Sequence, residues 1–403
     1  MKGILDQIRA KGVAYWITVL LLIALGTTLG EHLNESDLWL EAHYKTYQLL
    51  RKLSPQRARS TRTMVVLIGD KEYWKGELAR RIPIKRNYLA KLLRDLSAHD
   101  PGVIALDFDM RSPAPDLGDN QDYTEETREF IAAIREASLK TVVVLPATVK
   151  FDGSDQYVTE RAIYDGYSFN ENVRRGYISL PFDVRQVPLK LSVNGGKSLN
   201  SFAGEIVRAL DPKALPEVTP DSELPYGTFI GNREFCRLAS EDVLSGKPLS
   251  CMLRHNAVVV SGAWSKNAYG RGDKIDTYLT PIGYTNGVFV HANYVEALLG
   301  SRTYRPISKP ASITIEVIFS LLIAICLAMK LRPMTKLGLV LCSCLIVIAL
   351  SYVAIQNLGV FFDFFFPVVL LLLHSALEKV REWRADALEC IRLKNGELLH
   401  ERR

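Results

Sequence analysis

The chain has 403 residues, a formal net charge of +6 at pH 7, and 48% hydrophobic residues. Its basic residues are spread along the chain without a dense Lys/Arg cluster, which argues against nucleic acid as a partner. Four long apolar runs argue against a wholly water-soluble protein, because each is close to the ~20 residues that cross a bilayer as a helix.

The first apolar run, residues 13–29, predicts a transmembrane helix. Lys2, Arg9 and Lys11 precede this run, and basic flanks stay in the cytoplasm. A cleavable signal peptide is the alternative, but its apolar region is usually only ~7–15 residues and ends in a small-residue cleavage site. We therefore expect an uncleaved anchor that leaves residues 1–12 in the cytoplasm.

Three further transmembrane helices are predicted at residues 311–329, 337–355 and 359–377. The connector between the first two is cationic and the next one is uncharged, which places the first inside and the second outside. Four spans then put residues 30–310 outside the cytoplasm and the 378–403 tail inside. We expect a multi-pass protein of the plasma (inner) membrane, in contact with membrane lipid, with both termini cytoplasmic.

Residues 36–53 predict an amphipathic helix that leads from the membrane into the outer domain. Its expected apolar face consists of Leu38, Ala42, Leu49, Leu50 and Leu53. A polar linker follows.

The first half of the outer stretch alternates strands and helices. Buried strands are predicted at residues 63–70, 103–109 and 141–146, with helices at residues 85–98 and 124–137 between them. This alternation favours right-handed crossovers and a parallel sheet. The predicted fold is therefore an α/β extracytoplasmic domain with a largely parallel or mixed sheet, joined to an α-helical membrane domain.

The second half is less regular. We predict irregular structure at 150–185, a helix at 198–210, a Pro-rich loop at 211–225, strands at 226–231 and 257–262, a turn at 283–287 and a helix at 288–299. Two of the six cysteines, Cys236 and Cys251, lie in this stretch. Outside the cytoplasm they can form a disulfide, and two buried thiols are the alternative.

Several segments in order resemble a known sensory family. They are Val65–Asp70, Pro83–Arg86, Ile104–Phe108, Asp183–Leu189, Ala257–Gly262, Asp276–Pro281 and Gly287–Asn293. With one helix before and three after it, the outer stretch resembles the CHASE-type sensory domain, second type (cyclase/histidine-kinase-associated sensory, extracellular). Members of that family usually continue into a cyclase, a kinase or another output module. Here the tail after Leu377 has room for one amphipathic helix, so the resemblance implies a separate cytoplasmic output partner.

Three carboxylates, Asp70, Asp107 and Asp109, follow the ends of predicted parallel strands. Ligands bind at such strand ends, and three carboxylates can hold Mg²⁺ or Ca²⁺ in a hydrolase or a cation sensor. The alternative is that they serve turns and pair with Arg86 or Arg111.

A second candidate group lies near the start of the last outer helix. His291 and Asn293 can line a pocket beside Asp273 or Asp276, or they can be ordinary buried hydrogen-bonding residues. The full candidate ligand-binding set is Asp70, Arg86, Asp107, Asp109, Asp273, Asp276, His291 and Asn293. We find no nucleophilic triad and no Gly-rich phosphate loop, so we expect no catalytic residue, metal site or cofactor.

Three functions compete. The first is a membrane sensor subunit that binds a ligand or protein outside and acts through a cytoplasmic signalling or effector protein. The second is a membrane scaffold of an envelope complex, with a closed sheet-end pocket, and a homo-oligomer is expected. The third is a metal-dependent hydrolase. The residues proposed to contact a cytoplasmic partner are Val380, Trp383, Ala387 and Ile391.

Overall fold

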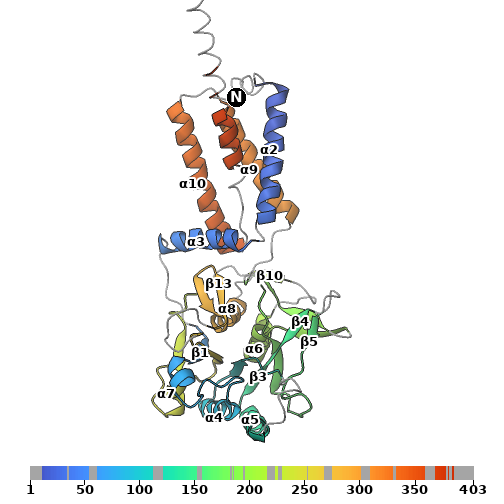
Figure 1. Ribbon diagram of the computed structural model, residues 1–403, viewed down its shortest axis with the longest axis vertical. Coiled ribbons are helices and arrows are strands. Elements are labelled where there is room, and N and C mark those ends of the chain that lie inside the picture. Colours follow the sequence, from blue (N-terminus) through green and yellow to red (C-terminus); the bar gives the residue numbers. More distant parts are fainter. Residues whose placement is uncertain are drawn as a thin grey trace, which may run out of the picture. The chain divides into compact units, whose positions relative to one another are not determined.

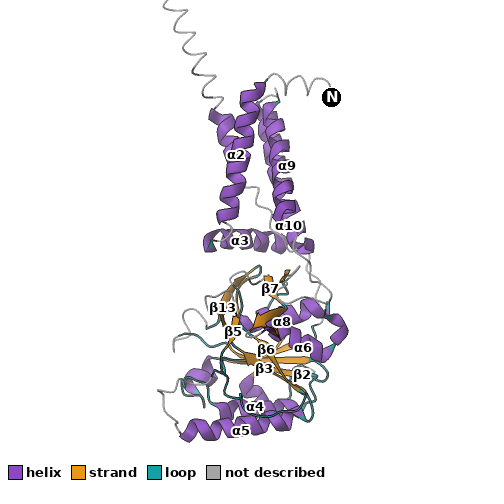
Figure 2. Cartoon of the chain, turned by 90° about the vertical axis from the view of Figure 1, so that its right-hand side faces the viewer, coloured by secondary structure: helices purple, strands orange, loops and turns teal. Residues whose placement is uncertain are grey.

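The computed structural model forms two compact units (Figures 1 and 2). It describes residues 11–33, 36–53, 61–111, 121–151, 157–181, 184, 186–193, 196–215, 223–225, 229–251, 253–266, 275–300, 309–329, 333–358, 368–377, 380 and 384. One unit holds Met1–His43, Ile307–Ile355 and Val360–Arg403, and the other holds Tyr44–Pro306 with Gln356–Gly359. We call them the helical unit and the α/β unit.

The helical unit contains α2 (Gly12–Leu33), α9 (Lys309–Ala328), α10 (Pro333–Leu358) and a helical stretch at Val368–Leu377. Its buried core joins residues of all four helices: Val19, Ile23, Ile323, Ala324, Leu327, Val347, Val368 and Leu371. Large apolar side chains such as Leu21 and Leu345 also point outward and are exposed. A helix that is apolar on every side suits a lipid environment.

Among the described residues, one helical segment, Gly12–Gly30, is both long and apolar enough to cross a bilayer. The stretches Ile313–Ala328, Leu341–Ala354 and Val368–Leu377 are shorter apolar helices. The first predicted transmembrane helix is therefore present as a long apolar helix, and the other three remain predictions.

The α/β unit is built on a six-stranded parallel sheet in the order β11-β1-β12-β2-β3-β6. The strands are β1 (Thr63–Ile68), β2 (Val103–Asp107), β3 (Val142–Ala147), β6 (Val173–Tyr177), β11 (Cys236–Ala239) and β12 (Ala257–Gly262). Strand β12 lies between β1 and β2, with Val259 beside Val65 on one side and Ala105 on the other. Every residue of β2 and β12 is buried, because helices cover both faces of the sheet.

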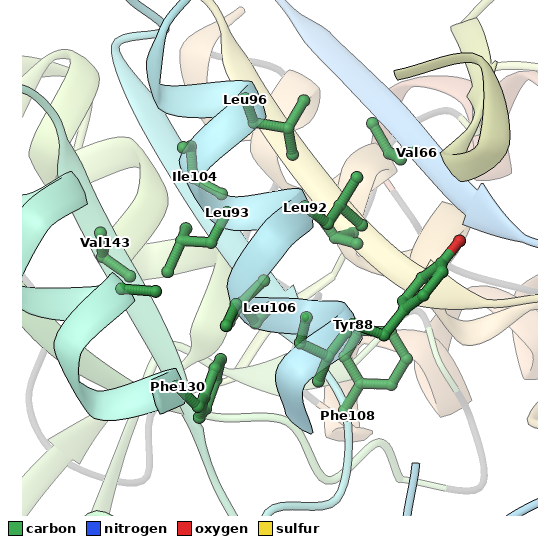
Figure 3. Close-up of a cluster of buried hydrophobic side chains, with 14 of the residues drawn as sticks. Val66, Tyr88, Leu92, Leu93, Leu96, Ile104, Leu106, Phe108, Phe130 and Val143 are labelled. Carbon is green, nitrogen blue, oxygen red and sulfur yellow. The ribbon is translucent and has the colours of Figure 1, made fainter. Parts of the chain in front are cut away.

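Helices α4 (Arg86–Ser97), α5 (Gln121–Ser138) and α7 (Ser240–Leu244) contribute to the core on one face of the sheet. Helices α6 (Phe202–Leu210) and α8 (Gly287–Leu299) form the core on the other face (Figure 2). Figure 3 shows Leu92, Leu93 and Leu96 of α4 in one cluster with Val66 of β1 and with Ile104 and Leu106 of β2. The spacing of these leucines, three and four residues apart, places them on one helix face.

Smaller elements complete the chain. They are α3 (Asp37–Leu53), a π-helical turn (Lys71–Lys75), a 3₁₀ turn (Pro212–Ala214), the sheet β4 (Val149–Phe151), β5 (Tyr157–Thr159), β8 (Lys190–Val193) and β9 (Lys197–Asn200), the pair β7 (Gln186–Pro188) and β10 (Glu223–Pro225), and the hairpin β13 (Thr277–Thr280) and β14 (Gly283–Asn286). On α3, Leu38, Ala42 and Leu49 are exposed, while Leu40 and Tyr44 are buried instead. The side chains of Leu50 and Leu53 lie outside the described part.

Several local predictions were wrong. Residues 150–185 are not irregular, because they contain β4, β5 and the sheet strand β6. The predicted helix at 198–210 begins only at Phe202, after β9, and the predicted turn at 283–287 is largely strand β14. No strand occupies 229–231, and 226–228 lie outside the described residues. The edge strand β11 and helix α7 were not predicted, because each is short and half polar.

A disulfide links Cys236 of β11 to Cys251, with a Cα–Cα separation of 6.3 Å. This separation lies in the ordinary range for disulfides, ~4.4–6.8 Å. Both residues also pack against the core on the α4 face. The bond therefore fixes an edge strand to the chain segment that precedes β12.

Replacing both cysteines, Cys236→Ala with Cys251→Ala, should lower the free energy of unfolding. The sequence separation of 15 residues corresponds to a loop-closure effect of about 3 kcal/mol. The measurement is urea unfolding of the full-length protein in detergent, followed by tryptophan fluorescence. Cys342→Ala, at an exposed free cysteine of α10, is the control and should leave the unfolding curve unchanged. A double variant as stable as the wild type would show that the crosslink contributes nothing.

Candidate functional site

A cleft of about 850 Å³ opens at the carboxyl edge of the main sheet. Asp107 ends β2, Gly262 ends β12, Thr148 follows β3 and Ile178 follows β6, and all four line the cleft. The carboxyl edge of a parallel sheet is where open α/β folds bind their ligands. The volume is in the ordinary range for small-molecule sites, ~300–1,000 Å³.

Asp107 and His291 meet at the floor of this cleft. His291 lies in the second turn of α8, and its Nε2 is 3.8 Å from Oδ1 of Asp107. Both side chains are almost fully buried, at 5% and 7% exposure. Oδ2 of Asp107 is buried and has no hydrogen-bond partner among the residues that the structure describes. The floor therefore contains a buried carboxylate oxygen that accepts no described hydrogen bond. Most buried acceptors in folded proteins do accept one.

Asp276 and Tyr278 form the adjoining wall. Asp276 precedes β13 with a left-handed backbone (φ 49°), and its carbonyl accepts a hydrogen bond from Gly287 N at 2.8 Å. Gly287 begins α8, and a β-carbon there would overlap the Asp276 carboxylate. Glycine at this position therefore allows the positive end of α8 to approach that carboxylate.

Burial controls the charge of these groups. It raises the pKa of Asp107 to about 7. Burial, together with the negative charge of Asp107, also raises the pKa of Asp276. Burial lowers the pKa of His291 to about 4, so the imidazole is neutral at physiological pH. Burial therefore disfavours the negative form of Asp107 and the positive form of His291, and a bound group of opposite charge would stabilise either one.

The rim of the cleft carries paired charges. Arg111 donates from Nε to Asp109 Oδ1 at 2.9 Å and from Nη1 to Glu160 at 3.1 Å. Arg81 forms an ion pair with Glu126 of α5 at 2.5 Å. These arginines are therefore engaged by carboxylates of the protein itself.

Residues 17–329 match the CHASE2 domain, which covers more than half of the chain. The chain belongs to the CHASE2 family. No curated protein and no solved structure matches it. CHASE2 is an extracytoplasmic sensory domain and not a known catalytic family, so membership indicates a sensor.

Four predicted site residues lie together in the CHASE2 cleft: Asp107, Asp109, Asp276 and His291. Asp273 lies outside the described residues. His291 and Asp276 both line the cleft, as the hypothesis of a pocket beside Asp273 or Asp276 expected.

Three other candidates do not line the CHASE2 cleft. Asp70 accepts hydrogen bonds from Ser265 N at 2.6 Å and Ser265 Oγ at 3.0 Å. Arg86 is buried at the start of α4, where its backbone N–H donates to Glu126 at 3.0 Å and its guanidinium donates to Thr127. Asn293 accepts from Ile230 N at 2.6 Å and donates to Phe289 O at 2.8 Å. These polar groups hold the fold together instead.

The metal-dependent hydrolase required Asp70, Asp107 and Asp109 to converge. Asp70 is engaged by Ser265, and Asp109 is engaged by Arg111. Within the described part of the chain, no group of three His, Cys, Asp or Glu side chains could hold a metal ion. The convergence expected of these three carboxylates is not formed.

Other residues that line the cleft were not predicted from the sequence. Ser261, near the end of β12, donates to the backbone carbonyl of Asp107 at 3.1 Å. Trp264 lines the cleft and is stacked on Tyr73 with ring centroids 4.1 Å apart. The polar residue that interrupts an apolar strand, as Ser261 does, was the available signal. Tyr278 lies on a hairpin that the sequence pattern had not predicted.

Proposed function

We propose that this protein is a membrane-anchored sensor subunit whose CHASE2 domain binds a small ligand in the cleft and acts through a separate cytoplasmic protein. The observation that carries the proposal is the unpartnered oxygen of Asp107 at the floor of an open cleft. An unsatisfied buried polar group costs about 1–3 kcal/mol. A ligand that supplies the missing donor would recover that free energy on binding.

The proposed topology has four transmembrane helices, both termini in the cytoplasm and residues 30–310 outside. Three features support it: the helical unit is apolar outside as well as inside, the connector at 330–336 is basic, and a disulfide suits an oxidising compartment. The exposed Leu38, Ala42 and Leu49 on α3 also suit a helix lying at a membrane surface.

Signal transfer is proposed to run through α8. This helix carries His291 and starts against Asp276, and only residues 300–308 separate it from α9. A ligand that binds two positions of α8 with different affinity would shift the balance between them. The output surface is proposed to be the tail. Val380 is exposed there, and Trp383, Ala387 and Ile391 lie outside the described residues.

The scaffold alternative is less well supported. It required the carboxyl edge of the sheet to be closed, and that edge opens into the cleft. A homo-oligomeric sensor remains part of the proposal, because self-association is compatible with an open cleft.

The test uses the full-length protein in lipid nanodiscs. After incubation with small molecules extracted from the culture medium and washing, native mass spectrometry should detect a retained mass. Thr148→Trp, which places a large ring among the lining residues, should weaken or abolish retention, whereas Leu139→Trp, at an exposed site outside the lining, should preserve it. No retained mass, or equal retention by both variants, would contradict a ligand-binding cleft.

A further inference from the structure

The floor of the cleft offers an acceptor and lacks a donor for it. Asp107 is 8% exposed and lines the cleft, and within the described part of the chain no group forms a hydrogen bond with its Oδ2. Its neighbour Ser261 directs its hydroxyl to the Asp107 backbone carbonyl at 3.1 Å, and His291 is 3.8 Å from the other carboxylate oxygen. Oδ2 is therefore placed where it could accept a hydrogen bond from a bound molecule.

The charges around the cleft favour a cationic donor. Among the described lining residues, four are acidic, Asp107, Asp109, Glu160 and Asp276, and two are arginines, Arg81 and Arg111. Each arginine already has a carboxylate of the protein. Arg81 keeps one buried Nη2 without a partner, but its guanidinium lies 4.3 Å from the Tyr123 ring and pairs with Glu126.

The remaining wall is apolar and partly aromatic. Phe108, Trp264 and Tyr278 contribute rings, and Ile178 and Leu180 contribute aliphatic surface. Stacking on Tyr73 at 4.1 Å holds the Trp264 ring in place. Aromatic faces attract ammonium groups and also cover the apolar body of a ligand.

We propose that the cleft binds an organic amine, whose ammonium donates to Asp107 Oδ2 and whose apolar body lies against Trp264 and Tyr278. This inference rests on the proposed function, because it names the ligand class of the same cleft. It disfavours a ligand that is purely anionic, since the described lining residues would present Asp107 and Asp276 to it, and both lining arginines already pair with carboxylates.

Amine binding should depend on pH. Burial raises the pKa of Asp107 to about 7, so an incoming ammonium displaces a proton below that pH. The titratable groups facing Asp107 are His291 of α8 and Asp276 and Tyr278 of the β13 segment, and His291 stays neutral above its lowered pKa. Affinity should therefore rise by up to about tenfold per pH unit on approaching pH 7, and then level off.

The test is titration calorimetry on the full-length protein in detergent. The probes are phenethylamine, 3-phenylpropionate and phenylalanine, which share one aromatic body and differ in charge. We expect phenethylamine to bind at least tenfold tighter than 3-phenylpropionate at pH 7.5 and to weaken at pH 5.5. Asp107→Asn should cost at least tenfold in its affinity, and Asp242→Asn, whose carboxylate pairs with Lys247 on the surface of α7, should cost nothing.

Trp264→Leu is a second variant that keeps the test decisive if Asp107→Asn fails to fold, and it should weaken phenethylamine by several-fold. The amine assignment would be overturned by equal binding of phenethylamine and 3-phenylpropionate, or by a preference for 3-phenylpropionate. It would also be overturned if phenethylamine showed no binding at concentrations up to about 10 mM, roughly the weakest affinity expected of a fragment. The proposed function fails separately. If the protein in nanodiscs retains a ligand that is not an amine, the proposed sensor function is supported and only the proposed ligand class is wrong.

Discussion

Asp107→Asn and His291→Gln should change the pH dependence of stability in opposite directions. The pKa of Asp107 is about 7 in the folded protein, above its ordinary value of 3.8, so the wild type loses stability as pH rises between those values. Asparagine removes this titration. As pH rises, the free energy of unfolding of the variant should therefore increase relative to that of the wild type, by up to about 1.4 kcal/mol per pH unit.

The His291 contribution has the reverse sign. Its folded pKa of about 4 is below the ordinary 6.5, so the wild type loses stability as pH falls through that window. As pH falls, the free energy of unfolding of His291→Gln should therefore increase relative to that of the wild type, with a similar change per pH unit. Over the full windows, each difference is on the order of 3–4 kcal/mol.

The measurement is urea unfolding of the full-length protein and both variants in detergent at pH 4.5, 5.5, 6.5 and 7.5. Asp276, whose pKa is raised by burial and by the charge of Asp107, is present in all three proteins, so its titration enters each difference curve only to the extent that the substitution changes its pKa. Parallel profiles for the two variants would show that the floor of the cleft does not shift either pKa as described.

Glu126→Ala should be the most damaging change among the described arginine–carboxylate and lysine–carboxylate pairs. Glu126 accepts a hydrogen bond from Arg81 at 2.5 Å and another from the backbone N–H of Arg86 at 3.0 Å, and its side chain is only 11% exposed. Its removal leaves the partly buried Arg81 guanidinium without its ion-pair partner and the Arg86 backbone N–H without its acceptor. The expected loss is about 3–4 kcal/mol of unfolding free energy.

Glu129→Ala on the same helix is the matched control. Glu129 pairs with Arg94 at 3.1 Å, but its side chain is exposed, so the expected loss is below about 1 kcal/mol. Both variants are compared with the wild type by urea unfolding at pH 7. Equal losses at the two positions would show that burial of the Glu126 pair adds nothing.

The centre of the sheet was predictable, whereas its edges were not. The continuous apolar runs that became β1, β2, β3 and β12 follow from burial on both faces, helix α4 follows from its periodicity, and α5 and α8 were also predicted as helices. Strand β6 carries two arginines and β11 is a four-residue edge strand, so neither has a continuous apolar run. Which strands pair depends on contacts between distant segments, and local patterns do not contain that information.

The candidate site was predictable to the level of position along a strand. Asp70 follows β1 and Asp107 ends β2 in the same sheet, yet Asp70 accepts hydrogen bonds from Ser265 and Asp107 lines the cleft. The difference depends on the loop after β12, which supplies Ser265 as a partner to Asp70. His291 and Asn293 are two residues apart on α8, so they point to different sides of the helix. Spacing therefore identified the right elements and could not tell which side chains face the cleft.

The place of β12 between β1 and β2 has a consequence for how the protein is made. The ribosome delivers β1 and β2 early, but they do not pair with each other, and the strand that joins them ends at Gly262. Until that strand arrives, the nascent chain has two unpaired inner strand edges, which are sites of aggregation. A chain truncated before Ala257 would lack its central ladder and should not fold as a half-domain. The sheet must therefore close late, and a chaperone that shields strand edges would have its greatest effect in that interval.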